Sequence, residues 1–154
     1  MASKTQVAAS RVVEVIPLVM RTLALEIRRT GHVPAPVHCR LMVLLADGPR
    51  NLSELAEKQA VSLPTMSNSI SALVERGWVT RVRAPHDRRM VMVELTPVGR
   101  RALNHIMGLV ETRVGHLLAS LSAAECDQLL AGLEVLHGCF ARTFGKAESS
   151  EEVG

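Results

Sequence analysis

Small polar side chains gather in one stretch of the 154-residue chain, where apolar residues three and four apart predict a helix. The inward stripe of this predicted helix comprises Leu63, Met66, Ile70 and Leu73. The outward positions are Pro64, Thr65, Ser67, Asn68 and Ser71, and Ser62, the residue that caps the helix, joins them as a candidate DNA contact. Hydroxyl and amide groups can pair with base edges or phosphates without filling a DNA groove. Because Ser, Thr and Asn form helix less readily than Glu, Lys or Ala, a merely solvated face is the weaker interpretation.

Arginines gather in the next stretch, residues 76–101. Seven arginines and two acids give this segment a charge of +5 (7 − 2), and since the whole chain carries +3, the remainder carries −2 (3 − 5). One cationic block on a near-neutral body indicates a polyanionic partner, but a solvated face accounts for the charge alone equally well. The candidate residues for binding such a partner are Arg81, Arg83, Asp87, Arg88 and Arg89.

The tip of this segment, residues 84–89, holds two adjacent arginines beside an acid. An arginine in a narrow minor groove meets a concentrated negative potential and offers a planar fork of donors. A carboxylate can hold one guanidinium in a fixed pose through paired hydrogen bonds. We therefore predict that Asp87 orients Arg89 and that Arg88 or Arg89 reaches DNA. The alternative is a solvated turn.

The elements that must position these side chains follow from hydrophobic period and capping residues. Spacings of three and four residues predict helices over 5–29, 37–46, 51–59, 62–76, 97–120 and 122–144. Pro17 either kinks the first helix or marks its true beginning. A change to period two predicts strands at 79–83 and 90–95, joined as a hairpin. Helix caps are expected at Asn51, Ser62, Thr96 and Ser122.

Two short helices joined by a tight turn form a helix-turn-helix candidate, whose second helix would enter the major groove of DNA. The motifs at 52–56 (LSELA), 73–79 (LVERGWV), 87–89 (DRR) and 95–99 (LTPVG) make residues 37–103 similar to the MarR family of bacterial winged-helix transcription regulators. The resemblance implies a mainly α fold with a small β-hairpin wing: a winged helix-turn-helix with long N- and C-terminal dimerisation helices. It maps the recognition helix onto 62–76 and the wing arginine onto Arg89.

The same resemblance implies a homodimer on pseudo-palindromic double-stranded DNA, usually a repressor that a small effector or an oxidant releases. The expected organisation is a dimerisation helix and loop at 1–36, a DNA-binding lobe at 37–96, dimerisation helices at 97–145 and a disordered tail at 146–154. Apolar stripes on the end helices must be buried against something. They support the dimer and comprise Val12, Ile16, Val19 and Leu23 at one end, and Leu129, Leu133, Leu136 and Phe140 at the other. The alternative is that these helices pack only within one chain.

The resemblance also implies an effector cleft between the dimerisation helices and the DNA-binding lobe. Its expected lining is Met20, His38, Leu41, Met42 and Leu45, and His38 stands where the family commonly has Gln. Apolar residues at helical spacing are also what a plain core requires, so that alternative stays open. With one Trp, two Phe and no Tyr, the chain offers little to stack on an aromatic ligand.

Three cysteines, an odd number without a CxxC pair, indicate reduced thiols in a cytosolic protein, and we expect a cytoplasmic location. Cys39 is the candidate for a redox-sensing regulator of the same fold, because it opens a predicted helix whose N-terminus lowers a thiol pKa, beside Arg40. The alternative is a small core residue. A metal site of His32, His38 and Cys39 is weaker than an interpretation as loop and surface histidines, so we expect no metal and no cofactor.

Enzymatic and membrane functions find no support in the sequence. It contains no phosphate-binding glycine loop, no Gly-x-Ser-x-Gly and no His-Glu-x-x-His, so we expect no enzyme. The longest apolar run, 41–46, is too short to span a membrane, and no membrane partner is expected. Two rivals to a DNA-binding regulator stay open: a winged-helix module that binds other proteins, and a small metal or thiol enzyme.

Overall fold

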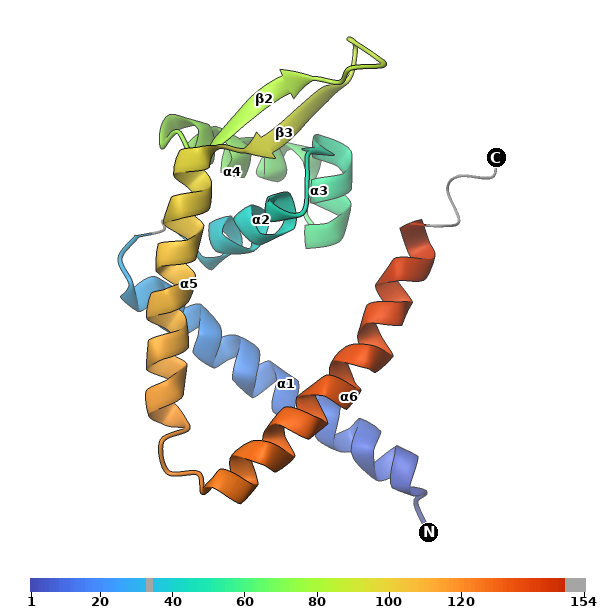
Figure 1. The fold of residues 1–154 in the computed structure, drawn as a ribbon. Coiled ribbons are helices and arrows are strands. Elements are labelled where there is room, and N and C mark those ends of the chain that lie inside the picture. Colours follow the sequence, from blue (N-terminus) through green and yellow to red (C-terminus); the bar gives the residue numbers. More distant parts are fainter. Residues whose placement is uncertain (33–34, 149–154) are drawn as a thin grey trace. The chain divides into compact units, whose positions relative to one another are not determined.

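The structure is a computed structural model that describes residues 1–32 and 35–148 (Figure 1). The elements follow one another as α1 (Lys4–Arg29), α2 (Pro36–Ala46), β1 (Arg50–Asn51), α3 (Leu52–Gln59), α4 (Leu63–Glu75), β2 (Val79–Arg83), β3 (Val91–Leu95), α5 (Pro97–Leu117) and α6 (Ala123–Glu148). The predicted mainly α fold with a small β-hairpin wing is confirmed. Up to Val114 the described residues form one compact unit, and from Gly115 to residue 148 they form a second.

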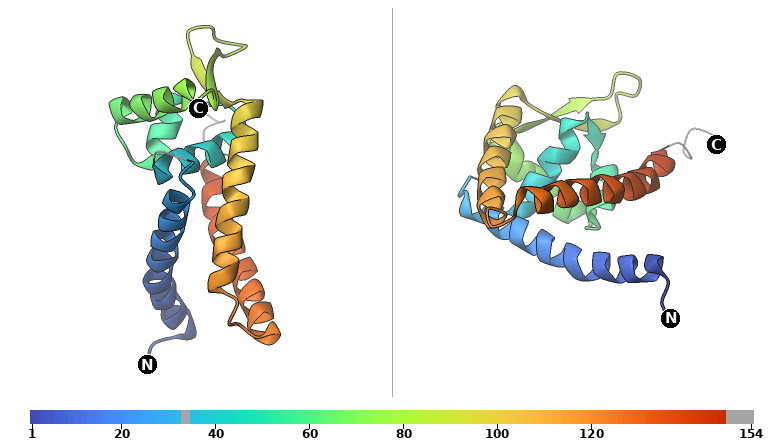
Figure 2. Two further views of the ribbon diagram at one scale, coloured as in Figure 1. Left: turned by 90° about the vertical axis from the view of Figure 1, so that its left-hand side faces the viewer. Right: turned by 60° about the horizontal axis from the view of Figure 1, so that its bottom comes forward.

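The first unit contains the predicted helix-turn-helix and the wing. Figure 2 shows α4 and the β2–β3 hairpin at the same end of this unit, with α1 and α5 extending away from that end. The second unit consists of the end of α5 and the single long helix α6.

Several element boundaries differ from the predictions; α5, for example, ends at Leu117 rather than near residue 120. Helix α1 begins at Lys4 and continues through Pro17, so the alternative in which it begins at Pro17 is wrong. Helix α6 extends to Glu148 rather than ending near residue 144, and residues 149–154 of the predicted tail lie outside the described residues. Strand β1 was not predicted, because two residues are too few to show a period.

Capping side chains fix the ends of α3 and α4 as predicted. Asn51 Oδ1 accepts a hydrogen bond from the Glu54 backbone N–H at 2.9 Å, and Glu54 Oε2 accepts one from the Asn51 N–H at 3.1 Å. This reciprocal pair satisfies two amides that the first turn of a helix leaves free. Between the two helices, Ala60 adopts a left-handed backbone with φ of 52°, which makes the tight turn. The side chain of Ser62 then caps α4.

The three strands form one antiparallel sheet in the order β1-β3-β2. Val82 pairs with Met92, and Arg81 pairs with Val93. Because side chains alternate along a strand, one face of the hairpin carries Val79, Val93 and Leu95 toward the core. Its opposite face carries Val82 and Met92.

The hydrophobic core of the first unit holds α4 in place. Met66, Ile70 and Leu73 of α4 are fully buried, together with Leu41 of α2 and Leu55 of α3. A helix anchored on one stripe must present its other residues outward. The prediction that Leu63 belongs to the same stripe is wrong, because this side chain is 50% exposed. Leu63 is the first residue of α4 and lies one turn short of the packed part of the stripe.

The junction between the wing and α5 is closed by Thr96, Gly77 and Gly99. Thr96 Oγ1 donates a hydrogen bond to the Gly77 carbonyl at 2.6 Å and accepts one from the Gly99 N–H at 3.0 Å. The predicted cap of α5 is therefore confirmed, and it also ties α5 to the end of α4. Gly99 is buried against the backbone of Trp78, where a Cβ would lie 2.0 Å from the carbonyl oxygen.

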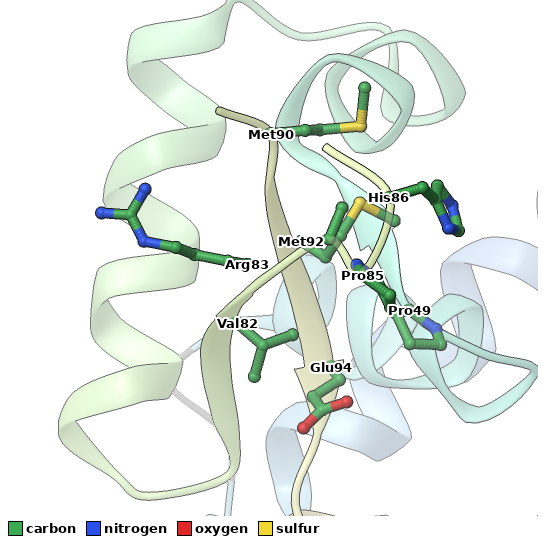
Figure 3. A pocket seen from close by; sticks show the side chains of 9 residues that line it. Pro49, Val82, Arg83, Pro85, His86, Met90, Met92 and Glu94 are labelled. Carbon is green, nitrogen blue, oxygen red and sulfur yellow. The ribbon is translucent and has the colours of Figure 1, made fainter. Parts of the chain in front are cut away.

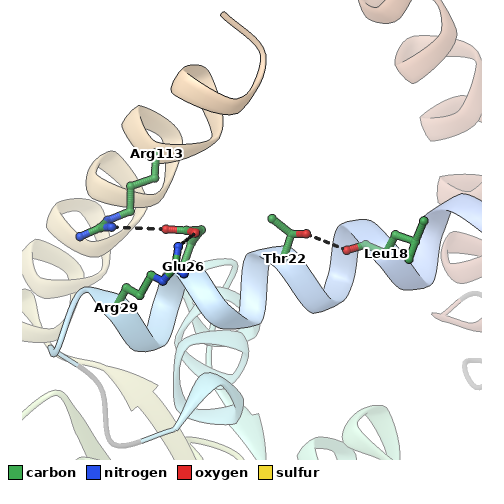
Figure 4. A network of polar contacts seen from close by, with 5 residues as sticks. All are labelled: Leu18, Thr22, Glu26, Arg29 and Arg113. Carbon is green, nitrogen blue, oxygen red and sulfur yellow. Dashed lines mark hydrogen bonds and ion pairs between the residues drawn. The ribbon is translucent and has the colours of Figure 1, made fainter.

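A buried carboxylate joins α1 to α5 (Figure 4). The Glu26 side chain is 6% exposed and forms ion pairs with Arg29 at 2.7 Å and Arg113 at 3.4 Å. The side chains of the two arginines remain 63% and 43% exposed, so the charge of Glu26 is balanced from the solvent side. One turn earlier, Thr22 Oγ1 donates to the Leu18 carbonyl at 3.0 Å.

Candidate nucleic-acid interface

The exposed face of α4 carries the polar residues that the sequence singled out. Pro64, Thr65 and Asn68 are exposed, and Ser67 and Ser71 are half-buried. The backbone N–H groups of the first turn point along the helix axis, where the helix dipole adds partial positive charge. This face therefore combines neutral donors and acceptors with a weak attraction for anions.

Two of these hydroxyls already bond to each other. Ser62 Oγ lies 2.9 Å from Thr65 Oγ1 and accepts a hydrogen bond from the Thr65 backbone N–H at 3.3 Å. A hydroxyl has one donor and two acceptor sites, so each retains capacity for a further partner. Ser62 thus has a structural role as the cap of α4, in addition to the DNA contact predicted for it.

Arg81 and Ser71, which were predicted as two separate DNA contacts, bond to each other and so connect the wing to α4. Arg81 Nη2 of β2 donates a hydrogen bond to Ser71 Oγ of α4 at 3.1 Å. The bond fixes the guanidinium beside the helix, and Arg81 remains exposed. An exposed arginine already held in one pose loses less side-chain entropy when it binds a phosphate.

The tip of the wing is shaped by its own side chains. Asp87 Oδ1 accepts a hydrogen bond from the backbone N–H of Arg89 at 2.9 Å, and Arg83 Nη1 donates to the carbonyl of Arg88 at 2.7 Å. The prediction that Asp87 holds the guanidinium of Arg89 is therefore wrong. A short acidic side chain two residues before an amide reaches that N–H more easily than a long flexible guanidinium.

The two tip arginines point to solvent. Arg88 and Arg89 are exposed, and the loop between β2 and β3 closes through a hydrogen bond from the Ala84 N–H to the Met90 carbonyl at 3.0 Å. The carboxylate and Arg83 therefore hold the backbone of the loop, while the charged heads at its tip are available to a partner.

Other arginines of the basic block have intramolecular partners. Arg76 Nη1 donates to the His32 carbonyl at 2.8 Å, and its guanidinium lies 4.9 Å from the centre of the Trp78 ring. Arg100 Nη2 donates to the Ala46 carbonyl at 3.2 Å. The cationic block of the sequence is thus divided between side chains that hold the lobe together and side chains directed outward from the wing.

The predicted effector lining is mostly core. Leu41, Met42 and Leu45 are fully or almost fully buried within the hydrophobic cluster, which the core alternative explains, and Met20 is exposed on α1. His38 is buried, and its Nδ1 has no hydrogen-bond partner. Burial, followed by the charge of Arg76, lowers the pKa of His38 below 6.5. A buried neutral imidazole with an unpaired nitrogen costs free energy.

A cavity that sequence reasoning missed lies on the outer face of the wing (Figure 3). It has a volume of about 350 Å³ and is lined by Pro49, Val82, Arg83, Ala84, Pro85, His86, Met90, Met92 and Glu94. The signal was present in the sequence, because residues 90–93 (MVMV) are apolar at every position rather than at alternate ones. Such a strand is apolar on both faces, and only one of them can meet the core.

The redox and metal candidates take ordinary structural positions. Cys39 is 2% exposed, and burial raises the pKa of its thiol, so the predicted lowering by the helix N-terminus is wrong. Its sulfur lies 4.0 Å from the sulfur of Met107, which fits the core alternative. The ring of His32 lies against that of His105, with centroids 5.0 Å apart. Across residues 1–32 and 35–148, no group of three or more His, Cys, Asp and Glu side chains could hold a metal ion.

Within the same residues, none of the helices combines the length and apolar character needed to cross a membrane.

This arrangement defines a winged helix-turn-helix: a capped recognition helix, a hairpin wing beside it, and flanking helices. Residues 33–90, which include the helix-turn-helix, match the model of the MarR family.

Several known proteins are similar to this chain in sequence or in fold. A Bacillus subtilis protein described as the uncharacterized HTH-type transcriptional regulator YpoP is 35% identical over 65 residues, which are 42% of this chain and 46% of that protein. The chain spans about half the length of the curated relatives it matches. The crystal structure of Rv1404 from Mycobacterium tuberculosis is similar with a TM-score of 0.74 and 20% identity, covering 92% of this chain and 97% of that one. The transcriptional repressor CouR, solved bound to a 23-mer DNA duplex, gives a TM-score of 0.63 and 25% identity, covering 88% and 99%.

Proposed function

We propose that this chain is a transcription regulator that binds double-stranded DNA sequence-specifically, with α4 in the major groove and the wing tip in the adjacent minor groove. The observation that carries the proposal is the placement of two surfaces at one end of the first unit. The exposed polar face of α4 rests on a fully buried stripe, and the exposed Arg88 and Arg89 stand at the tip of a hairpin bonded to it through Arg81. On this proposal Pro64, Thr65, Ser67, Asn68 and Ser71 approach bases or phosphates, and Arg81, Arg88 and Arg89 approach phosphates.

We further propose that the functional unit is a homodimer formed by the segments 1–36 and 97–145. Within the single chain, apolar side chains stand exposed on α1, among them Val15, Ile16 and Val19, and on α6, among them Leu133 and Phe140. Contiguous exposed apolar side chains favour burial against a partner. A two-fold dimer places two recognition helices about 34–36 Å apart, one turn of DNA, and thereby requires a pseudo-palindromic operator.

Repression and release by a small effector complete the proposal. The transcriptional repressor CouR, of similar fold, was solved on a DNA duplex, which supports a repressor role for this chain. Release requires that an effector prefer the conformation that does not fit DNA. His38 is buried and its Nδ1 has no hydrogen-bond partner. This supports the proposal that an effector binds next to His38 and offers a hydrogen-bond donor or acceptor to Nδ1.

The experiment is selection of duplexes from a random-sequence pool by the full chain, followed by fluorescence anisotropy with the selected duplex over a range of salt concentrations. A two-fold symmetric winner and a linear fall of log K with log salt support the proposal. Sedimentation equilibrium of the free protein measures the oligomeric state. Replacement of both Arg88 and Arg89 by Ala should reduce the salt slope by about 0.9 for each phosphate that is no longer neutralised. The matched control, Arg40→Ala, removes an exposed arginine of α2 that lies outside the hairpin, α4 and the proposed dimerisation segments, and should leave the slope unchanged.

A second function, binding of another protein by the winged helix, is distinguished by the same measurement. It predicts that no duplex is enriched and that any weak binding is equal for all sequences. The exposed arginines at the wing tip favour the DNA-binding function over this one.

A further inference from the structure

Leu63 is the large apolar side chain of α4 that the fold leaves half exposed. The other three members of its stripe, Met66, Ile70 and Leu73, have no exposed surface, whereas Leu63 is 50% exposed. Leu63 is the first residue of the helix, directly after the Ser62 cap and directly before the exposed Pro64. In a helix-turn-helix, the N-terminal residues of the second helix are those that touch base edges.

The rest of α4 limits which bases it can recognise. The helix Leu63–Glu75 contains no Lys and no Arg. The bidentate fork to guanine O6 and N7, the commonest specific contact to a G·C pair, therefore cannot come from this helix. Besides hydroxyls, the N-terminal part of the exposed face offers an amide at Asn68, which can pair bidentately with adenine, and apolar side chains at Leu63 and Pro64, of which Leu63 is the longer.

An exposed leucine matches one group in the major groove. The C5 methyl of thymine is the only apolar group that a base pair presents there, and small or apolar side chains contact it. Burial of both apolar surfaces removes them from water, whereas Leu63 opposite a polar base edge would leave that edge without a hydrogen bond. The contact would thus discriminate thymine from cytosine, whose major-groove edge presents an amino donor and no methyl group.

We propose that Leu63 contacts the C5 methyl of a thymine, so that α4 reads A·T base pairs in each half-site. This proposal rests on the proposed function, since it requires that α4 enter the major groove. Leu63 is then a determinant of sequence specificity, and the arginines of the wing supply affinity without choosing the base.

The test replaces thymine by uracil, which differs only by lacking the C5 methyl. The duplex selected by the wild-type chain is resynthesised with uracil at each thymine position in turn, placed symmetrically in both half-sites, and its dissociation constant is measured at fixed salt. Removal of one buried methyl group should weaken wild-type binding about fourfold per half-site, or about sixteenfold for both, at one symmetric pair of positions. Leu63→Ala should bind the thymine and uracil duplexes equally.

Two features keep this experiment decisive. Leu63 is not part of the buried core cluster and Ala forms helix well, so Leu63→Ala should fold, and its circular dichroism and melting temperature report this directly. The matched control Val43→Ala shortens an exposed apolar side chain on α2 and should retain the preference for thymine.

The outcomes separate the two proposals. If a duplex is selected but uracil weakens wild-type and Leu63→Ala binding equally, or no thymine is required in either half-site, Leu63 does not read thymine and the proposed function stands. If no duplex is enriched at all, both proposals are overturned.

Discussion

Gly99→Ala tests the packing that fixes the wing against α5. The Cβ of alanine would lie 2.0 Å from the carbonyl oxygen of Trp78 and 2.8 Å from its carbon. To reach an ordinary contact of 3.4 Å, the oxygen and the Cβ must separate by 1.4 Å (3.4 − 2.0). The obstacle is backbone, so no side-chain rotamer can relieve it. The same carbonyl accepts a hydrogen bond from the Thr96 N–H at 3.0 Å, and a shift would strain it.

The magnitude follows from two opposing terms. Overpacking costs about 1–3 kcal/mol, and a backbone obstacle belongs at the upper end. Alanine offsets up to about 1 kcal/mol of this through its better helix propensity. We therefore expect Gly99→Ala to lower the free energy of unfolding by about 2 kcal/mol, a fall in melting temperature of about 4–8 °C for a chain of this size.

The control is the same substitution in the same helix. Gly108 of α5 has nothing within 4 Å of its Cβ position, so Gly108→Ala should raise stability by about 1 kcal/mol. Thermal melts followed by circular dichroism, at one protein concentration because dimerisation shifts melting temperatures, compare both variants with the wild type. Opposite signs support the reasoning. A Gly99→Ala variant as stable as Gly108→Ala would refute it.

Three further predictions follow from single side chains. The pKa of His38 is below 6.5 in the folded chain, so the unfolded chain binds more protons as the pH falls below that value. The free energy of unfolding should therefore decrease as the pH drops below about 6.5 and through the pKa of the folded state. Urea midpoints measured at several pH values should show a smaller decrease for His38→Gln than for the wild type. Arg89→Ala should weaken binding to the selected duplex by about 1–3 kcal/mol in anisotropy titrations at fixed salt, and unchanged binding would contradict a wing contact. Glu26→Gln should lower the free energy of unfolding by about 1–2 kcal/mol, because the two arginine partners stay solvated. Replacing Arg29 and Arg113 together by Met should lower it by about 3–5 kcal/mol, because a buried carboxylate is then left unpaired. Urea unfolding measures both, and equal losses would argue against this asymmetry.

Local chemistry made most of the elements predictable from the sequence. The box of Asn51 and Glu54, the Ser62 cap and the Thr96 cap each depend on residues within three positions of one another, and all three formed. The sequence could not predict elements whose existence depends on pairing with a distant strand. Strand β1 forms because Arg50 and Asn51 pair with Val93 and Met92 of β3. A two-residue segment has no pattern of its own from which this pairing could be predicted.

The same distinction applies to the candidate site. The types of its residues could be predicted from the sequence, but the hydrogen-bond partner of each residue could not. The seven arginines in residues 76–101 predicted a cationic surface, and the residue types alone were enough for this prediction. Their individual roles depended on which acceptor lay within reach: Arg76 found the carbonyl of His32, 44 residues away, and Arg83 found the carbonyl of Arg88 across the hairpin. Asp87 was assigned to a guanidinium by charge, but a main-chain N–H two residues away lies nearer and costs less entropy to hold. At the wing tip, Asp87 and Arg83 bond to the backbone of Arg88 and Arg89. The side chains of Arg88 and Arg89 therefore remain exposed to solvent.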